Sequence, residues 1–139
     1  MTGARAGGCG LAVLLPLLGG CATLWPPVDA RSPQAVPAVI SCARTAVQAL
    51  GYKIVRSGPD ELEGQKTDTT ARLAPEDYQR YDDLTVRATP GDAAGGSALH
   101  LVPGTVTVRI SRAGRFEKDE PASPGVQRDA RAVVQRCGG

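Results

Sequence analysis

The order in which the spacing of apolar residues changes along the chain is its strongest constraint on the fold. From residue 34 to residue 50, apolar side chains recur at intervals of three and four, which predicts an amphipathic helix that Gly51 ends. From 52 onward the interval changes to two in several short stretches, as in strands with one buried face, and helical spacing returns over 125–137. This order predicts an α+β fold of two layers, in which an antiparallel sheet of four to five strands carries both helices on one face.

Turn-forming residues divide the period-two stretch into separate strands. The expected strands are 52–56, 61–67, 83–88, 98–102 and 105–111. Pro103 and Gly104 either turn the chain between the last two or bend one long strand. A short helix is predicted within 75–81, and 112–124 is predicted as a loop because it is polar and contains two prolines.

The first twenty residues have the features of a secretory signal peptide. Arg5 is their only charged side chain, and the apolar run 11–18 is followed by Gly19 and Gly20. The run is too short to span a membrane, which takes about 20 residues, and Pro16 interrupts it. We therefore expect residues 1–20 to direct export and to be removed.

The residues at the end of this segment, Leu18-Gly19-Gly20-Cys21, resemble the lipobox of bacterial lipoproteins. The resemblance implies that Cys21 receives a diacylglycerol on its thiol and becomes the first residue of the mature protein. Two or three acyl chains form a stable membrane anchor. Residue 22 is alanine and not aspartate, which by the same resemblance favours the outer membrane, facing the periplasm. The alternative is an ordinary signal peptide cut after Ala30, with no role for Cys21.

A tether is predicted between the anchor and the domain, over residues 21–32, with the domain itself at 33–139. Pro26 and Pro27 favour extended backbone there. Trp25 either sits at the membrane interface, packs on the domain or is exposed.

Two of the four cysteines remain once Cys9 is removed and Cys21 is lipidated. A remaining pair in an exported protein predicts a disulfide, here between Cys42 and Cys137. The bond would hold the two predicted helices side by side over the sheet. Because the bond closes a loop of almost the whole domain, the chain-entropy estimate of its stabilisation is about 4–5 kcal/mol.

Composition excludes several classes of function. A formal net charge of +2, from 16 basic and 14 acidic residues, argues against nucleic-acid binding. The single histidine, His100, alternates with Leu99 and Leu101 and is predicted on the solvent face of a strand, without catalytic partners. The sequence predicts no cofactor, no metal and no enzymatic activity.

Several polar and aromatic groups have two interpretations. The carboxylate pairs Glu61/Glu63 and Asp82/Asp83 lack the spacing of a metal loop, so we expect them to be solvated surface. A basic run is either a patch for anionic lipid headgroups or envelope polymers, or a solvated strand end and loop. Tyr78 and Tyr81 either pack on the sheet or form a spot for a partner. The basic run consists of Arg109, Arg112, Arg115 and Lys118.

The sequence thus predicts a small lipid-anchored domain of the bacterial envelope. Balanced charge, small size and the lack of catalytic groups favour a non-enzymatic module that binds another envelope protein through a sheet face or edge. The alternative is a carrier of a small apolar or lipidic ligand between sheet and helices. The partner, the ligand and the oligomeric state are not specified by the sequence.

Overall fold

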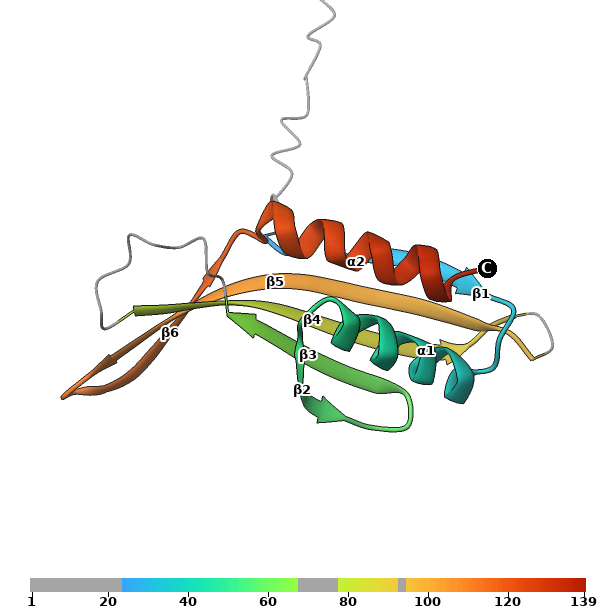
Figure 1. Ribbon diagram of the computed structural model, residues 1–139, viewed down its shortest axis with the longest axis horizontal. Coiled ribbons are helices and arrows are strands. Elements are labelled where there is room, and N and C mark those ends of the chain that lie inside the picture. The colour runs from blue at the N-terminus through green and yellow to red at the C-terminus, as the bar shows by residue number, and fades with distance from the viewer. Residues whose placement is uncertain (1–23, 68–77, 93–94) are drawn as a thin grey trace, which may run out of the picture.

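The computed structural model describes residues 24–67, 78–92 and 95–139, and two helices lie on one face of a six-stranded antiparallel sheet (Figure 1). This confirms the predicted α+β class. The predicted signal peptide 1–20 and the lipidation site Cys21 lie outside the described residues. In chain order the elements are β1 (Val28–Ser32), α1 (Val36–Ala49), β2 (Lys53–Ser57), β3 (Glu61–Thr67), β4 (Tyr78–Pro90), β5 (Ser97–Ser111), β6 (Gly114–Glu120) and α2 (Pro124–Cys137).

The long strands β4 and β5 form the centre of the sheet. The strand order is β1-β5-β4-β3-β2, and β6 also pairs with β5. β1 lies against residues 97–101 of β5, and β6 lies against residues 105–111 of the same edge. β1 and β6 therefore follow one another along a single edge of β5, with a gap between them at residues 102–104.

α1 begins after Ala35 without a side-chain cap, whereas a serine caps the start of α2. α1 has Pro37 in its first turn, and Gly51 leaves the helix with a φ of 90°, a conformation that costs glycine little. α2 begins after Ser123, whose hydroxyl accepts a hydrogen bond from the backbone N–H of Val126 at 3.1 Å. Both helices bury one apolar stripe against the sheet.

The core fills the space between the sheet and the helices. Leucine and valine side chains of β3, β4 and β5 alternate onto the helix-facing side of the sheet. Gly64 lets α1 approach closely, because a Cβ there would lie 2.7 Å from Cγ1 of Val47. The fully buried aliphatic side chains include Leu62, Leu84, Val86, Leu99 and Leu101 from the sheet and Val39, Val47, Val126 and Val133 from the helices.

The structure corrects the boundary of the tether predicted at 21–32, because residues 28–32 form strand β1. Val28 and Ala30 turn toward the core, and the strand pairs in register with Leu101 through Ser97 of β5. β1 has only five residues, and Val28 and Ala30 are its only apolar ones, so the strand gives a weak period-two pattern. The pairing with β5 is what makes this segment a strand.

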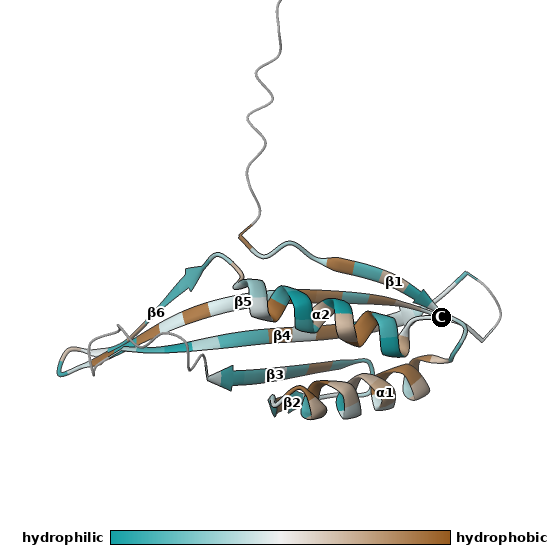
Figure 2. Cartoon of the chain, turned by 45° about the horizontal axis from the view of Figure 1, so that its top comes forward, coloured by the Kyte–Doolittle hydropathy of each residue, from teal (hydrophilic) through white to brown (hydrophobic). Residues whose placement is uncertain are grey.

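The segment predicted as a loop at 112–124 contains β6, so this prediction was wrong for residues 114–120. β6 is hydrophilic along most of its length (Figure 2). Nearly all of its residues are exposed, so it lacks the alternation that marks a strand with one buried face. With β1 and β6 the sheet formed by the described residues has six strands, where four to five were predicted.

Residues 98–111 belong to one continuous strand, so Pro103 and Gly104 do not turn the chain. Pro103 lies in the gap between β1 and β6, where β5 has a strand neighbour on one side only. A residue without a backbone N–H is tolerated at such a position. β4 is also longer than predicted. Residues 78–81 of the helix predicted at 75–81 belong to β4, and the rest of it lies outside the described residues.

Candidate functional site

The chain enters the domain through the gap between β1 and β6. The indole Nε1 of Trp25 donates a hydrogen bond to the backbone oxygen of Glu120 at 2.8 Å. The backbone N–H of Ala122 donates to the oxygen of Leu24 at 2.9 Å. The two residues thus join the segment that follows β6 to the start of the described chain, at the edge where β1 and β6 meet.

Trp25 packs directly on Gly104 of β5. A Cβ at Gly104 would lie 2.8 Å from Cδ2 and 2.8 Å from Cε2 of the indole. Of the three alternatives for Trp25, the structure therefore shows packing on the domain. Trp25 is partly buried and also packs against the hydrophobic core. Cys21 is four residues earlier, a distance of at most about 14 Å along the chain.

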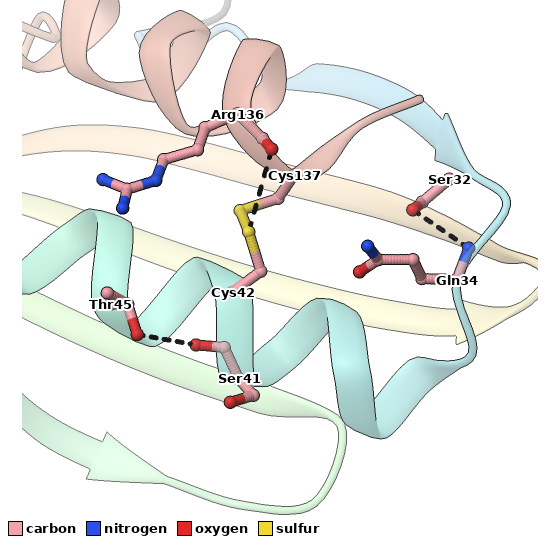
Figure 3. The surroundings of a disulfide bond; sticks show 7 residues. All are labelled: Ser32, Gln34, Ser41, Cys42, Thr45, Arg136 and Cys137. Carbon is pink, nitrogen blue, oxygen red and sulfur yellow. Dashed lines mark hydrogen bonds between the residues drawn. A yellow bond between two sulfur atoms is a disulfide. The ribbon is translucent and has the colours of Figure 1, made fainter.

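The two cysteines predicted to pair are joined by a disulfide in the structure (Figure 3). Cys42 lies in the middle of α1 and Cys137 is the last residue of α2, with their Cα atoms 5.8 Å apart and a sequence separation of 95. A hydrogen bond just after Cys137 ties this end of the chain to β1, because the N–H of Gly139 donates to the backbone oxygen of Arg31 at 3.0 Å. The bond therefore fixes the helices to each other beside the strand that leads to the N-terminus.

A buried polar network lies under the N-terminus of α2, and the expectation that Asp82 is solvated was wrong. Asp82 is 5% exposed, and its Oδ1 accepts hydrogen bonds from the hydroxyls of Thr105 and Ser123, each at 2.9 Å. Thr105 Oγ1 in turn accepts from the N–H of Ser123 at 2.9 Å. The network connects β4, β5 and the N-cap of α2. The sequence signal for it is a serine before a proline at a helix start, which does not show its distant partners.

A second polar cluster joins α2 to β3 and to the residues between α1 and β2. Asp129 Oδ2 accepts from Lys66 Nζ at 2.7 Å and from the hydroxyl of Tyr52 at 2.9 Å. Lys66 also donates to the oxygen of Leu50 at 3.2 Å, at the end of α1. Burial, together with the Asp129 carboxylate, raises the pKa of Tyr52, so its hydroxyl stays protonated and donates. These bonds position α1, β3 and α2, and we assign them a structural role.

The sheet face away from the helices carries charged cross-strand pairs. Arg56 contacts Glu61 at 3.1 Å and Glu63 at 2.8 Å, and Arg87 contacts Glu61 at 3.0 Å. Glu61 and Glu63 thus lie on one surface, as predicted, and each is paired. Surface pairs of this kind contribute little to stability, but they define a polar face of alternating charge.

Asp83 lies on the same face beside these pairs. Burial raises the pKa of Asp83 to about 6, and the charge of Glu63 acts in the same direction. Gln65 Nε2 donates to its Oδ2 at 3.5 Å, while its Oδ1 is buried without a hydrogen-bond partner among the described residues. Asp82 and Asp83 are therefore adjacent in sequence but lie on opposite faces of the sheet.

His100 lies on the solvent side of β5, as predicted. Its Nδ1 is 2.6 Å from Oδ1 of Asp29 on β1, and both side chains are about half or more exposed. The pair borders an open hollow of about 420 Å³ that Arg31 and Arg87 also line. Across the described ranges 24–67, 78–92 and 95–139, no group of three or more histidine, cysteine, aspartate or glutamate side chains could hold a metal ion.

The residues of the basic run lie on and beside the β5–β6 hairpin. Arg109 stacks over the ring of Tyr78, with its guanidinium carbon 5.6 Å from the ring centroid. Arg115 pairs with Glu117 at 2.8 Å, and Lys118 pairs with Glu120 at 3.3 Å. Arg112 is exposed in the turn between β5 and β6. Tyr81, by contrast, bonds through its hydroxyl to Gln79 on its own strand.

The chain matches no protein-family model and no curated protein. Within the part of the chain that the structure describes, no helix is long and apolar enough to cross a membrane.

Proposed function

We propose that this protein is a lipid-anchored, non-enzymatic module of the bacterial envelope, held at the outer membrane through Cys21 and facing the periplasm. Its role would be to bind another envelope protein through the exposed face or edge of the sheet. The observation that carries the proposal is the lipobox-like sequence ending at Cys21, only four residues before Trp25 on the domain surface.

The junction at Trp25 supports an anchored role for the domain. The indole bonds to Glu120 and packs on Gly104, so the polypeptide leaves the sheet at a fixed point. A lipid on Cys21 would hold this point within about 14 Å of the bilayer surface. An anchor attached to a fixed edge presents the rest of the sheet in a restricted set of orientations.

The disulfide supports an oxidising compartment. A bond between Cys42 and Cys137 persists in the periplasm but is rare in a bacterial cytosol. This agrees with export directed by residues 1–20.

The exposed sheet face supports a role in binding. It carries the ion pairs of Arg56, Glu61, Glu63 and Arg87, in which both signs of charge alternate. A face of this kind favours a protein partner with a matching pattern of charge, which contributes specificity and speed of association.

The alternative of a carrier for an apolar ligand has no supporting observation among the described residues. The space between sheet and helices is filled by side chains such as Leu84, Leu101 and Val126, all fully buried. The hollow beside His100 is open and has charged residues on its lining. We therefore rank the carrier second.

The experiment has two parts, the first of which tests the anchor. The mass of protein extracted from its native membrane is measured by mass spectrometry, both intact and after proteolysis. A lipid adduct on Cys21 is expected in the native chain and in Cys9→Ser, which alters a cysteine outside the lipobox-like motif. The adduct should be absent in Cys21→Ser. A native chain that begins at Arg31 without a lipid would refute the anchor.

The second part tests the role. Crosslinking in cells is followed by identification of captured proteins, with Arg56→Glu as the surface variant and Arg131→Glu on α2 as the matched control. One envelope protein captured by the native chain and the control, and lost with Arg56→Glu, is the expected result. Capture that is equal for both variants, or no capture at all, would contradict binding through the sheet face. Small molecules that co-purify with the native chain would favour the carrier.

A further inference from the structure

The β5–β6 hairpin extends beyond both helices, and it carries two large hydrophobic side chains in solvent (Figure 1). We name residues 109–116 the hairpin tip. Ile110 is 54% exposed and Phe116 is 55% exposed. Exposure of two such side chains on a narrow projection costs solvation free energy that binding would recover.

The two hydrophobic residues lie on opposite faces of the ribbon. Ile110 pairs across the strands with Arg115, and Phe116 pairs with Arg109. Cross-strand partners share a face, and the two pairs are on alternate positions, so each face of the tip carries one hydrophobic side chain and one arginine. The turn adds Arg112 at the end of the projection.

The tip is also the most basic part of the hairpin. Residues 109–116 contain three arginines and no acidic residue. Glu117, just outside the tip, pairs with Arg115 at 2.8 Å, which leaves Arg112 at the end and Arg109 beside Tyr78 as the other cations. Acidic residues Asp119 and Glu120 lie toward the base of β6, away from the turn.

We propose that the hairpin tip is a docking site for an anionic lipid bilayer. A protein partner would cover one face of the ribbon and leave the hydrophobic side chain of the other face in water. A fluid bilayer interface surrounds a projection on all sides and accepts both Ile110 and Phe116. Arginines beside hydrophobic side chains suit this depth, because the guanidinium groups reach the lipid phosphates while the apolar groups enter the acyl boundary.

The tip and the entry of the chain lie at opposite ends of β6, on the same edge of β5. β6 and the entry of the chain follow the same edge of β5, since Ala122 after β6 bonds to Leu24 at 2.9 Å. Leu24 is itself 51% exposed at this edge. The docking proposal goes beyond the proposed function, because it requires neither acylation of Cys21 nor a protein partner.

The test uses residues 24–139, which contain all eight elements, the core and the disulfide, so that neither the leader nor Cys21 contributes to binding. Binding is measured by co-sedimentation with vesicles of phosphatidylethanolamine and phosphatidylglycerol, and with vesicles of phosphatidylcholine alone. We expect binding to the anionic vesicles that weakens with added salt, and at least tenfold weaker binding to the neutral ones, an order of magnitude expected for a few arginines near an anionic surface.

Two variants and two matched controls locate the site. Arg112→Glu should weaken binding to anionic vesicles about tenfold or more, because it replaces an attraction by a repulsion. Ile110→Ser with Phe116→Ser should reduce binding to a similar extent at low and high salt. The controls are Val55→Ser, which alters a side chain 48% exposed on β2, and Arg131→Glu on α2, and both should bind as the native sequence does.

Equal binding of all variants would overturn the proposal, as would native protein that does not bind anionic vesicles. If the hairpin tip does not bind vesicles but crosslinks to a protein, the membrane-docking proposal is overturned in favour of a protein-binding site. Failure of Cys21 acylation in cells would leave these results unaffected, so the two proposals fail separately.

Discussion

The indole of Trp25 occupies the position where Gly104 would carry a side chain, with two ring atoms 2.8 Å from an added Cβ. The packing of the indole on the strand requires both residues. The ring needs a strand position without a side chain, and the gap between β1 and β6 gives it access to that position. The hydrogen bond from Nε1 to Glu120 then fixes the ring at the point where the chain enters the sheet.

We predict that Gly104→Val displaces the Trp25 ring. The added side chain overlaps the indole, so the variant should lose about 1–3 kcal/mol of unfolding free energy, as other overpacked sites do. Trp25 is the only tryptophan, so its fluorescence reports on this site alone. The emission should shift to longer wavelength, and acrylamide should quench it more strongly.

Gly58→Ala is the matched control, since an added Cβ there would meet its nearest atom at an ordinary 3.6 Å. It should leave the emission unchanged. A Gly104→Val protein with native emission and native quenching would show that the ring does not depend on this position.

Removal of the disulfide should strongly destabilise the domain. Cys42→Ser and Cys137→Ser each open a loop of 95 residues, for which the chain-entropy estimate is about 4–5 kcal/mol. Chemical unfolding of the oxidised native protein and of each variant measures the difference. The double variant should be about as unstable as either single one, because each loses the same bond. Two free thiols in the folded native protein would contradict the bond itself.

Thr105→Val should destabilise the buried network under α2. The substitution keeps the shape of the side chain but removes the hydroxyl that donates to Asp82 and accepts from Ser123. A buried carboxylate that loses a donor costs about 2–3 kcal/mol, to be measured by urea unfolding at neutral pH. Thr107→Val, two residues further along β5 and partly exposed, should change the unfolding free energy by less than about 0.5 kcal/mol. Similar losses in both variants would argue against the network.

Asp83→Asn should make the protein more stable at neutral pH. The pKa of Asp83 is about 6 in the folded protein against 3.8 as the ordinary value, so the folded state keeps a proton that the unfolded state has lost. The unfolding free energy therefore falls as the pH rises between these two values and is constant above them. Asparagine carries no charge, so it should remove this fall and gain about 1 kcal/mol at neutral pH, once screening by solvent is allowed for.

Urea unfolding over this pH range checks the sign for Asp83→Asn. If the native protein and the variant show the same slope below neutral pH, Asp83 does not carry the expected shift.

The two helices could be predicted from the sequence because each repeats its apolar residues within a few positions. Both helices are found within two residues of the predicted ends, at Val36–Ala49 and Pro124–Cys137. The strand 61–67 has its predicted bounds for a similar reason, since turn residues border it. The pair Cys42 and Cys137 followed from counting the cysteines that would remain after the predicted export.

The tertiary structure alone decided which polar segments join the sheet. β1 and β6 become strands because the two halves of one edge of β5 offer them backbone partners, and their own residues show little alternation. The burial of Asp82 depends on hydroxyls 23 and 41 residues away, and the place of Trp25 depends on a glycine far along the chain. Periodic spacing of apolar residues depends only on residues close together in the sequence. The sequence by itself therefore determined the helices, the central strands and the α+β class. Contacts between distant residues exist only after the chain has folded, so the edges of the sheet, its buried polar groups and the fixed entry point of the chain were decided by the tertiary structure.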